Sequence, residues 1–62
     1  MRDEIKAIAM KMHEKGDDEM IKYKVIVENR LGKGLGVKDT TPQQAQLMEL
    51  ILSDLNDEGY SA

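Results

Sequence analysis

The sequence predicts a small all-α domain of three helices joined by a glycine-rich loop, and we expect it to form a homodimer. Three observations favour this fold class. Two stretches carry apolar residues at helical spacing, and a third opens with a strong helix-start signal and contains the longest apolar run of the chain. With 62 residues the sequence describes a single domain. An α+β fold with a strand over residues 20–28 is the alternative.

The first helix is expected at residues 2–15. Ile5, Ile8, Ala9 and Met12 follow the i, i+3, i+4, i+7 pattern that places side chains on one face of a helix. Two acidic residues in the first turn and a lysine just before a glycine at the end suit the helix macrodipole and the C-cap.

The segment 17–31 fits two kinds of structure. As a helix it has Asp17 as N-cap, Gly32 just past its end and one apolar stripe, which consists of Met20, Tyr23, Val27 and Leu31. As a strand it shows an alternating apolar set, which consists of Ile21, Tyr23, Val25 and Val27. Ile26 breaks that alternation. Because the start and stop signals agree at both ends, the helix is favoured.

The loop and the third helix follow in order. Glycines at positions 32, 34 and 36 disfavour regular structure and predict a glycine-rich loop over residues 32–40. Thr41 as N-cap, Pro42 at the first helical position and Gln44 two residues later form a capping box. The third helix should therefore cover residues 41–57, and residues 58–62 should form a frayed tail.

The third helix carries more apolar surface than one neighbour needs. At 100° per residue its apolar side chains span roughly 200°, about twice what a surface helix requires. We expect a second copy to close part of this arc. The predicted dimer interface consists of Leu47, Met48, Leu50, Ile51, Leu52 and Leu55. The alternative is a monomer in which this helix is central.

Composition also favours self-association. A chain of this size has marginal stability alone, and it contains no cysteine, phenylalanine or tryptophan that could supply disulfides or a large aromatic core. No stretch reaches the roughly 20 apolar residues of a membrane span. The charged N-terminus does not resemble a signal peptide. We therefore expect a cytoplasmic protein that does not contact membranes.

The basic residues are unevenly distributed: all nine lie between Arg2 and Lys38. Within residues 20–38 five of them accompany the single acid Glu28, which leaves a local excess of four positive charges. Such a segment can bind an acidic protein surface or nucleic-acid phosphates. The predicted partner-binding residues are Lys22, Tyr23, Lys24, Arg30, Lys33 and Lys38.

Residues for chemistry are few. The glycine loop lacks the Gly-Lys-Ser/Thr of a phosphate-binding loop, and His13 lacks the second histidine of a zincin helix. The segment 54–60 has the spacing of half an EF-hand loop, without the closing acid at its twelfth position. Absence of cysteine excludes a thiolate nucleophile or zinc site. We expect no enzyme activity, no metal site and no cofactor.

The sequence therefore predicts a non-enzymatic protein-interaction or regulatory module. We expect an adaptor or inhibitor of phage or mobile-element type, which acts as a homodimer and binds a protein partner that the sequence does not identify. A nucleic-acid-binding accessory protein, with segment 22–38 as its contact surface, is the alternative.

Overall fold

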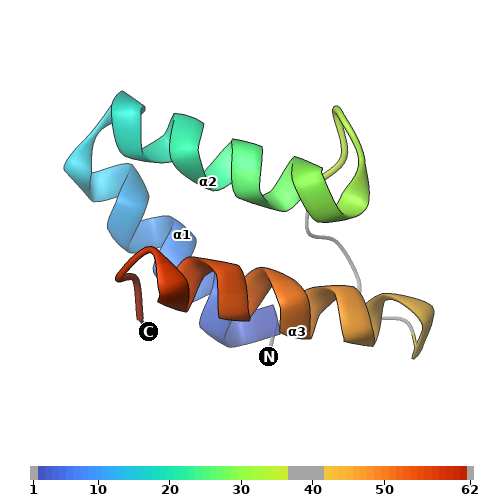
Figure 1. The fold of residues 1–62 in the computed structure, drawn as a ribbon. Helices are drawn as coiled ribbons and strands as arrows, with labels where there is room; N and C mark the ends of the chain where they lie inside the picture. Colours follow the sequence, from blue (N-terminus) through green and yellow to red (C-terminus); the bar gives the residue numbers. More distant parts are fainter. Residues whose placement is uncertain (1, 37–41, 62) are drawn as a thin grey trace.

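The computed structural model describes residues 2–36 and 42–61, and it contains three α-helices. These are α1 (Arg2–Lys15), α2 (Asp17–Leu31) and α3 (Pro42–Asp57), shown in Figure 1. The described residues form no strand, so the all-α prediction is confirmed and the strand alternative for residues 20–28 is wrong. Lys38 lies outside the described residues, and so does Thr41, the predicted N-cap of α3.

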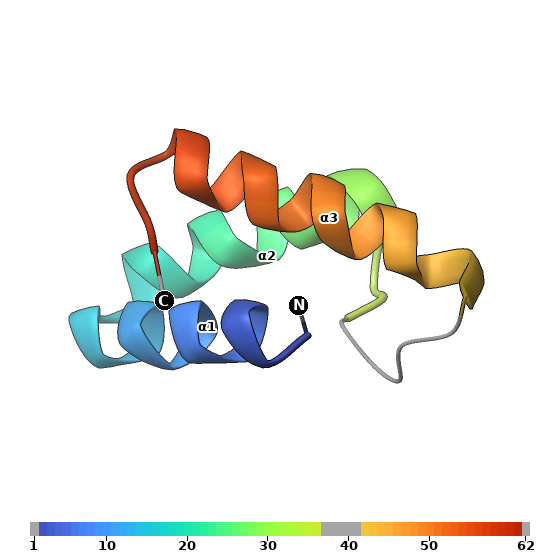
Figure 2. The same cartoon turned by 90° about the horizontal axis from the view of Figure 1, so that it is seen from below.

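The three helices surround a common centre. Figure 1 shows α2 above α3, with the two helices running in opposite directions, and Figure 2 shows α1 below both of them. A single residue, Gly16, separates α1 from α2. Its dihedral angles, φ 123° and ψ −178°, lie in a region that is essentially restricted to glycine. This residue is the N-cap of α2 and makes no side-chain bond, so the prediction that Asp17 is the cap was wrong by one position.

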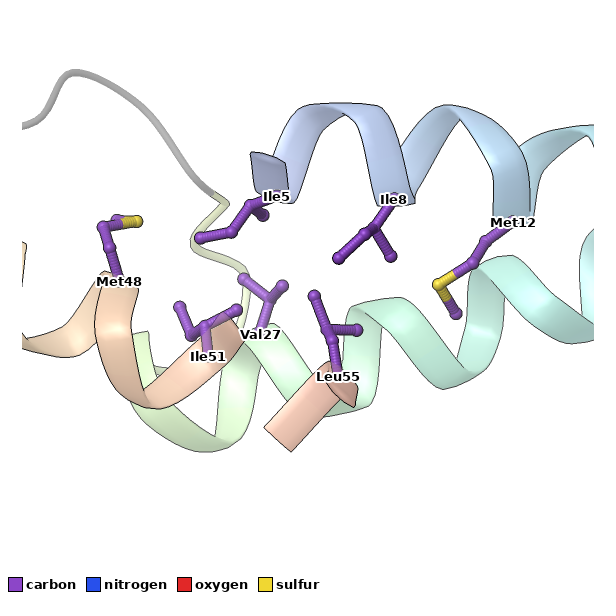
Figure 3. Packing of buried hydrophobic residues seen from close by; sticks show 7 residues of the cluster. All are labelled: Ile5, Ile8, Met12, Val27, Met48, Ile51 and Leu55. Atoms are coloured by element: carbon purple, nitrogen blue, oxygen red, sulfur yellow. The ribbon is translucent and has the colours of Figure 1, made fainter. Parts of the chain in front are cut away.

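Side chains from all three helices form the core (Figure 3). Its fully buried members are apolar: Ile5, Ile8, Met12, Val27, Met48, Ile51 and Leu55. The stripe predicted on α1 thus points inward, although Ala9 is only half-buried. On α2 Val27 is buried, and the other stripe residues pack at the edge of the core. The helical periods therefore predicted both inward faces.

The C-terminal end of α3 closes with a Schellman motif. The amide of Gly59 donates to the carbonyl of Asn56 at 2.9 Å, and the amide of Tyr60 donates to that of Leu55 at 3.0 Å. Gly59 has φ 91°, which this motif requires. A specific hydrogen-bond pattern thus explains why the helix ends at residue 57, as the sequence predicted.

The segment after α3 is held against α1 and α2 instead of being frayed. The hydroxyl of Tyr60 donates to a carboxylate oxygen of Glu19, and the Lys15 ammonium lies 5.4 Å from the centre of the Tyr60 ring. The ammonium of Lys11 also donates to the carbonyl of Ser61 at 3.1 Å. Tyr60 therefore connects the end of α3 to both other helices, a long-range set of contacts that local sequence rules do not predict.

Candidate protein-interaction surface

The six apolar residues predicted as a dimer interface on α3 do not share one environment. Met48, Ile51 and Leu55 have no exposed surface, because α1 and α2 already cover them within one chain. Leu47 and Leu52 are half-buried, and Leu50 is 37% exposed. Only the last three retain surface that a second chain could cover. The core of the single chain thus already covers much of the apolar face of α3.

Arg30, predicted to bind a partner, is paired with an acidic residue of the same chain. Its guanidinium donates to both carboxylate oxygens of Asp54, with Nε–Oδ2 at 2.8 Å and Nη2–Oδ1 at 3.0 Å. This paired geometry links the end of α2 to α3. The hydrogen bonds from Arg30 lower the pKa of Asp54 from its ordinary value, and the same contact raises the pKa of Arg30. The segment 22–38 therefore presents less free positive charge than the sequence suggests.

The Arg30–Asp54 pair predicts a dependence of stability on pH. Because the pKa of Asp54 is lower in the folded chain than in the unfolded one, the pair stabilises the fold above the unfolded pKa, about 3.9. That contribution is lost as the pH falls through the folded pKa. Thermal unfolding should show a lower midpoint for Asp54→Asn than for the wild type at neutral pH, with the two midpoints converging in acid.

The matched control for this pair is Glu49→Gln, which neutralises an exposed carboxylate on the same helix. Its midpoint should stay near that of the wild type across the pH range. A difference between Asp54→Asn and the wild type that persists at the lowest pH would contradict the assignment, because protonated Asp54 no longer pairs with Arg30 as an anion.

The other predicted partner-binding residues are distributed around α2 and the loop. Lys22 is exposed and lies 3.5 Å from the carboxylate of Glu19. Tyr23 is half-buried at the edge of the core, and burial raises its pKa. Lys24 and Lys33 are exposed. Of the basic residues described in this segment, Lys22 and Arg30 therefore each lie beside an acidic residue.

Among the described residues, the most exposed pair of branched apolar side chains lies instead on the outer face of α2. Ile21 is 60% exposed and Val25 is 52% exposed. One helical turn separates them, so their side chains form a short continuous ridge along the helix. We refer to Ile21 and Val25 as the α2 ridge. Burying such side chains fully would contribute about 1.5–3 kcal/mol each.

A groove lies on the loop side of this ridge, which we name the loop groove. It has a volume of about 560 Å³ and is lined by α2 and by residues 34–36, with Met20, Lys24 and Leu35 among its walls. The amide of Gly34 donates to the carboxylate of Glu28, which holds the loop against the helix. Leu35 remains 51% exposed. The loop therefore adds a third apolar side chain to this surface.

A second groove lies between the ridge and the segment after α3, and we name it the tail groove. Its volume is about 310 Å³, and Ile26 and Tyr60 line it together with both ridge residues. The contact between Tyr60 and Glu19 fixes its outer wall. The α2 ridge thus has an apolar-lined groove on each side.

Sequence reasoning missed this surface, although the signal was present. In the sequence Ile21 and Val25 also fit the alternating pattern of a strand, which hides their position on a helix. On a helix they are four residues apart and lie well away from the inward stripe that contains Val27. A helix with two separate apolar faces packs one of them in the core and leaves the other open for a second contact.

Other predicted features place few constraints on function. His13 is exposed at the end of α1. Asp54, the first residue of the half EF-hand spacing, is on α3 and pairs with Arg30. Within residues 2–36 and 42–61, no helix is long and apolar enough to cross a bilayer.

Comparison with known proteins finds similarity to a prophage-derived protein. The chain is 40% identical over 57 residues to the SPbeta prophage-derived uncharacterized protein YorG of Bacillus subtilis (strain 168). The match covers 92% of this chain and 17% of that protein. No family model matches the sequence, and no solved structure matches it significantly. The chain is therefore similar to one short segment of a longer prophage-derived protein.

Proposed function

We propose that this domain is a non-enzymatic protein-interaction module of phage type, an adaptor or inhibitor whose α2 ridge docks on another protein chain. The observation that carries the proposal is the exposure of Ile21, Val25 and Leu35 beside two grooves. Exposed apolar residues that gather on one face are typical of protein contact sites.

Two further observations support this function. The similarity to a small part of YorG is consistent with a module that is found joined to other sequence. The fully buried side chains of the described residues are all apolar, so they serve to stabilise the fold. A partner would then be bound by side chains at the surface. A homodimer is the simplest assembly in which such a module would work.

The nucleic-acid alternative receives less support from the same geometry. Arg30 is paired with Asp54, Lys22 lies beside Glu19, and Glu28 lies within the segment 22–38. Phosphate binding depends on cations that are free to release counterions from the nucleic acid. The contacts within the domain therefore reduce the charge that this segment offers.

A capture experiment tests the proposal: the domain is immobilised and incubated with a lysate of its native host. We expect specific proteins to be captured by the wild type and lost with the double variant Ile21→Gln/Val25→Gln, because glutamine preserves helix propensity and removes the apolar contact. Mass spectrometry of the bound fractions is the measurement.

Met10→Gln is the matched control, since Met10 is an exposed apolar residue on α1 with 62% of its surface accessible. It should retain the captured proteins. Nuclease treatment should leave them bound, and raising the salt concentration should weaken binding only modestly. Identical capture by the double variant, or loss of all captured material after nuclease treatment, would contradict the proposed function.

A further inference from the structure

The α2 ridge and its two grooves have the form of a self-complementary surface. A ridge made by residues four apart packs into the groove beside an equivalent ridge on another helix. Here one surface contains both parts, because Ile21 lines the loop groove and both ridge residues line the tail groove. Two copies related by a two-fold axis would each provide a ridge for the other's groove.

We infer that the chain that docks on the α2 ridge is a second copy of this domain, with the two α2 helices antiparallel. The inference rests on the proposed function and names the partner of the same surface. It also moves the expected dimer contact from α3 to α2.

Charge determines the relative direction of the two helices. The first turn of α2 is acidic, with Asp17 and Asp18 exposed and Glu19 already paired with Lys22, whereas the loop after its last turn carries the exposed Lys33. In an antiparallel pair the acidic turn of each copy lies toward Lys33 of the other. A parallel pair would set the two acidic turns side by side, which costs repulsion. Antiparallel packing also opposes the two helix dipoles favourably.

Exposure favours α2 over α3 as the contact. Ile21 and Val25 are 60% and 52% exposed, against 37% for Leu50, the most exposed apolar side chain that the structure describes on α3. Leu35 extends the α2 surface by a third exposed apolar side chain. A second copy on α2 therefore covers more apolar surface that the domain itself leaves open.

The size of this surface sets the expected strength. A stable complex typically buries about 800 Å² on each partner, and we expect a contact confined to one helix and its adjoining loop to be smaller. We therefore expect a reversible dimer with a dissociation constant of about 10–100 µM. Measurements must extend from below to well above this range.

Sedimentation equilibrium over about 10 µM to about 1 mM tests the contact. The wild type should approach twice the monomer mass. Ile21→Gln/Val25→Gln should raise the dissociation constant at least about tenfold, whereas Leu50→Gln should leave it unchanged. Circular dichroism checks that each variant is folded. We expect all of them to fold, because the three substituted positions are exposed. Loss of the dimer in Leu50→Gln alone would overturn the inference in favour of α3.

Cross-linking tests the direction, and the cysteine-free chain makes it specific. Asp17→Cys and Lys33→Cys are prepared separately and treated with a short bismaleimide. The mixture of both should form cross-linked dimers faster than either variant alone. Faster cross-linking of Asp17→Cys with itself would contradict the antiparallel arrangement.

The two experiments separate this inference from the proposed function. If the wild type is monomeric throughout while host-protein capture still depends on Ile21 and Val25, the second copy is excluded and the interaction module stands. If neither sedimentation nor capture responds to these residues, both are overturned.

Discussion

Ile51→Ala should lower the free energy of unfolding by about 2–5 kcal/mol, the range for truncating a fully buried isoleucine. Ile51 lies in the middle of α3, and its side chain meets residues of the other helices in the core (Figure 3). A domain of this size has a total stability of only about 3–9 kcal/mol. The loss should therefore reduce the thermal midpoint by at least about 8 °C.

Leu50→Ala is the control, because it removes the same kind of side chain from the adjacent position on the outer side of α3. Its effect should stay below about 1 kcal/mol. Thermal unfolding followed by circular dichroism, at one protein concentration for all variants, is the measurement. Equal losses for the two variants would show that Leu50 and Ile51 share one environment, contrary to the structure.

Gly16→Ala should destabilise the domain by about 1–3 kcal/mol although it removes no contact. A Cβ at this position would meet no atom within 4 Å, so steric conflict with neighbours does not contribute. The cost comes from φ 123° at the junction between α1 and α2, which an alanine adopts only under strain. Gly16 is the single residue between α1 and α2, so no other residue at the junction can take up the strain.

Gly36→Ala is the matched control for this effect. A Cβ there also meets nothing within 4 Å, but its φ lies outside the strained positive region. Alanine should be neutral or stabilise by up to about 1 kcal/mol, since it restricts the unfolded chain. Chemical denaturation of both variants checks the pair. A loss in Gly36→Ala as large as that in Gly16→Ala would rule out backbone strain as the cause.

The sequence predicted the helices because their signals are local. The apolar period and the glycines at 16 and 32 define α1 and α2, and the segment 42–57 begins with a proline at the first helical position. These signals depend on residues within one or two turns, so they hold whatever the rest of the chain does. The outward role of Ile21 and Val25 is equally visible in the spacing once α2 is a helix.

Features that depend on how the helices pack could not be predicted in this way. The width of the apolar arc on α3 does not say whether one chain or two will cover it, and α1 and α2 together bury Ile51 and Leu55. The pair between Arg30 and Asp54 joins residues 24 apart in sequence, which no spacing rule identifies. The contacts of Tyr60 are of the same long-range kind.

The central claim is that a second copy of this domain docks on the α2 ridge, and a dilution series of amide NMR spectra tests it most directly. We predict that, as the protein concentration rises through about 10–100 µM and above, amide shifts change around Ile21, Val25 and Leu35 and remain constant around Leu47 and Leu50. Shifts that change along α3 and remain constant along α2 would contradict the claim.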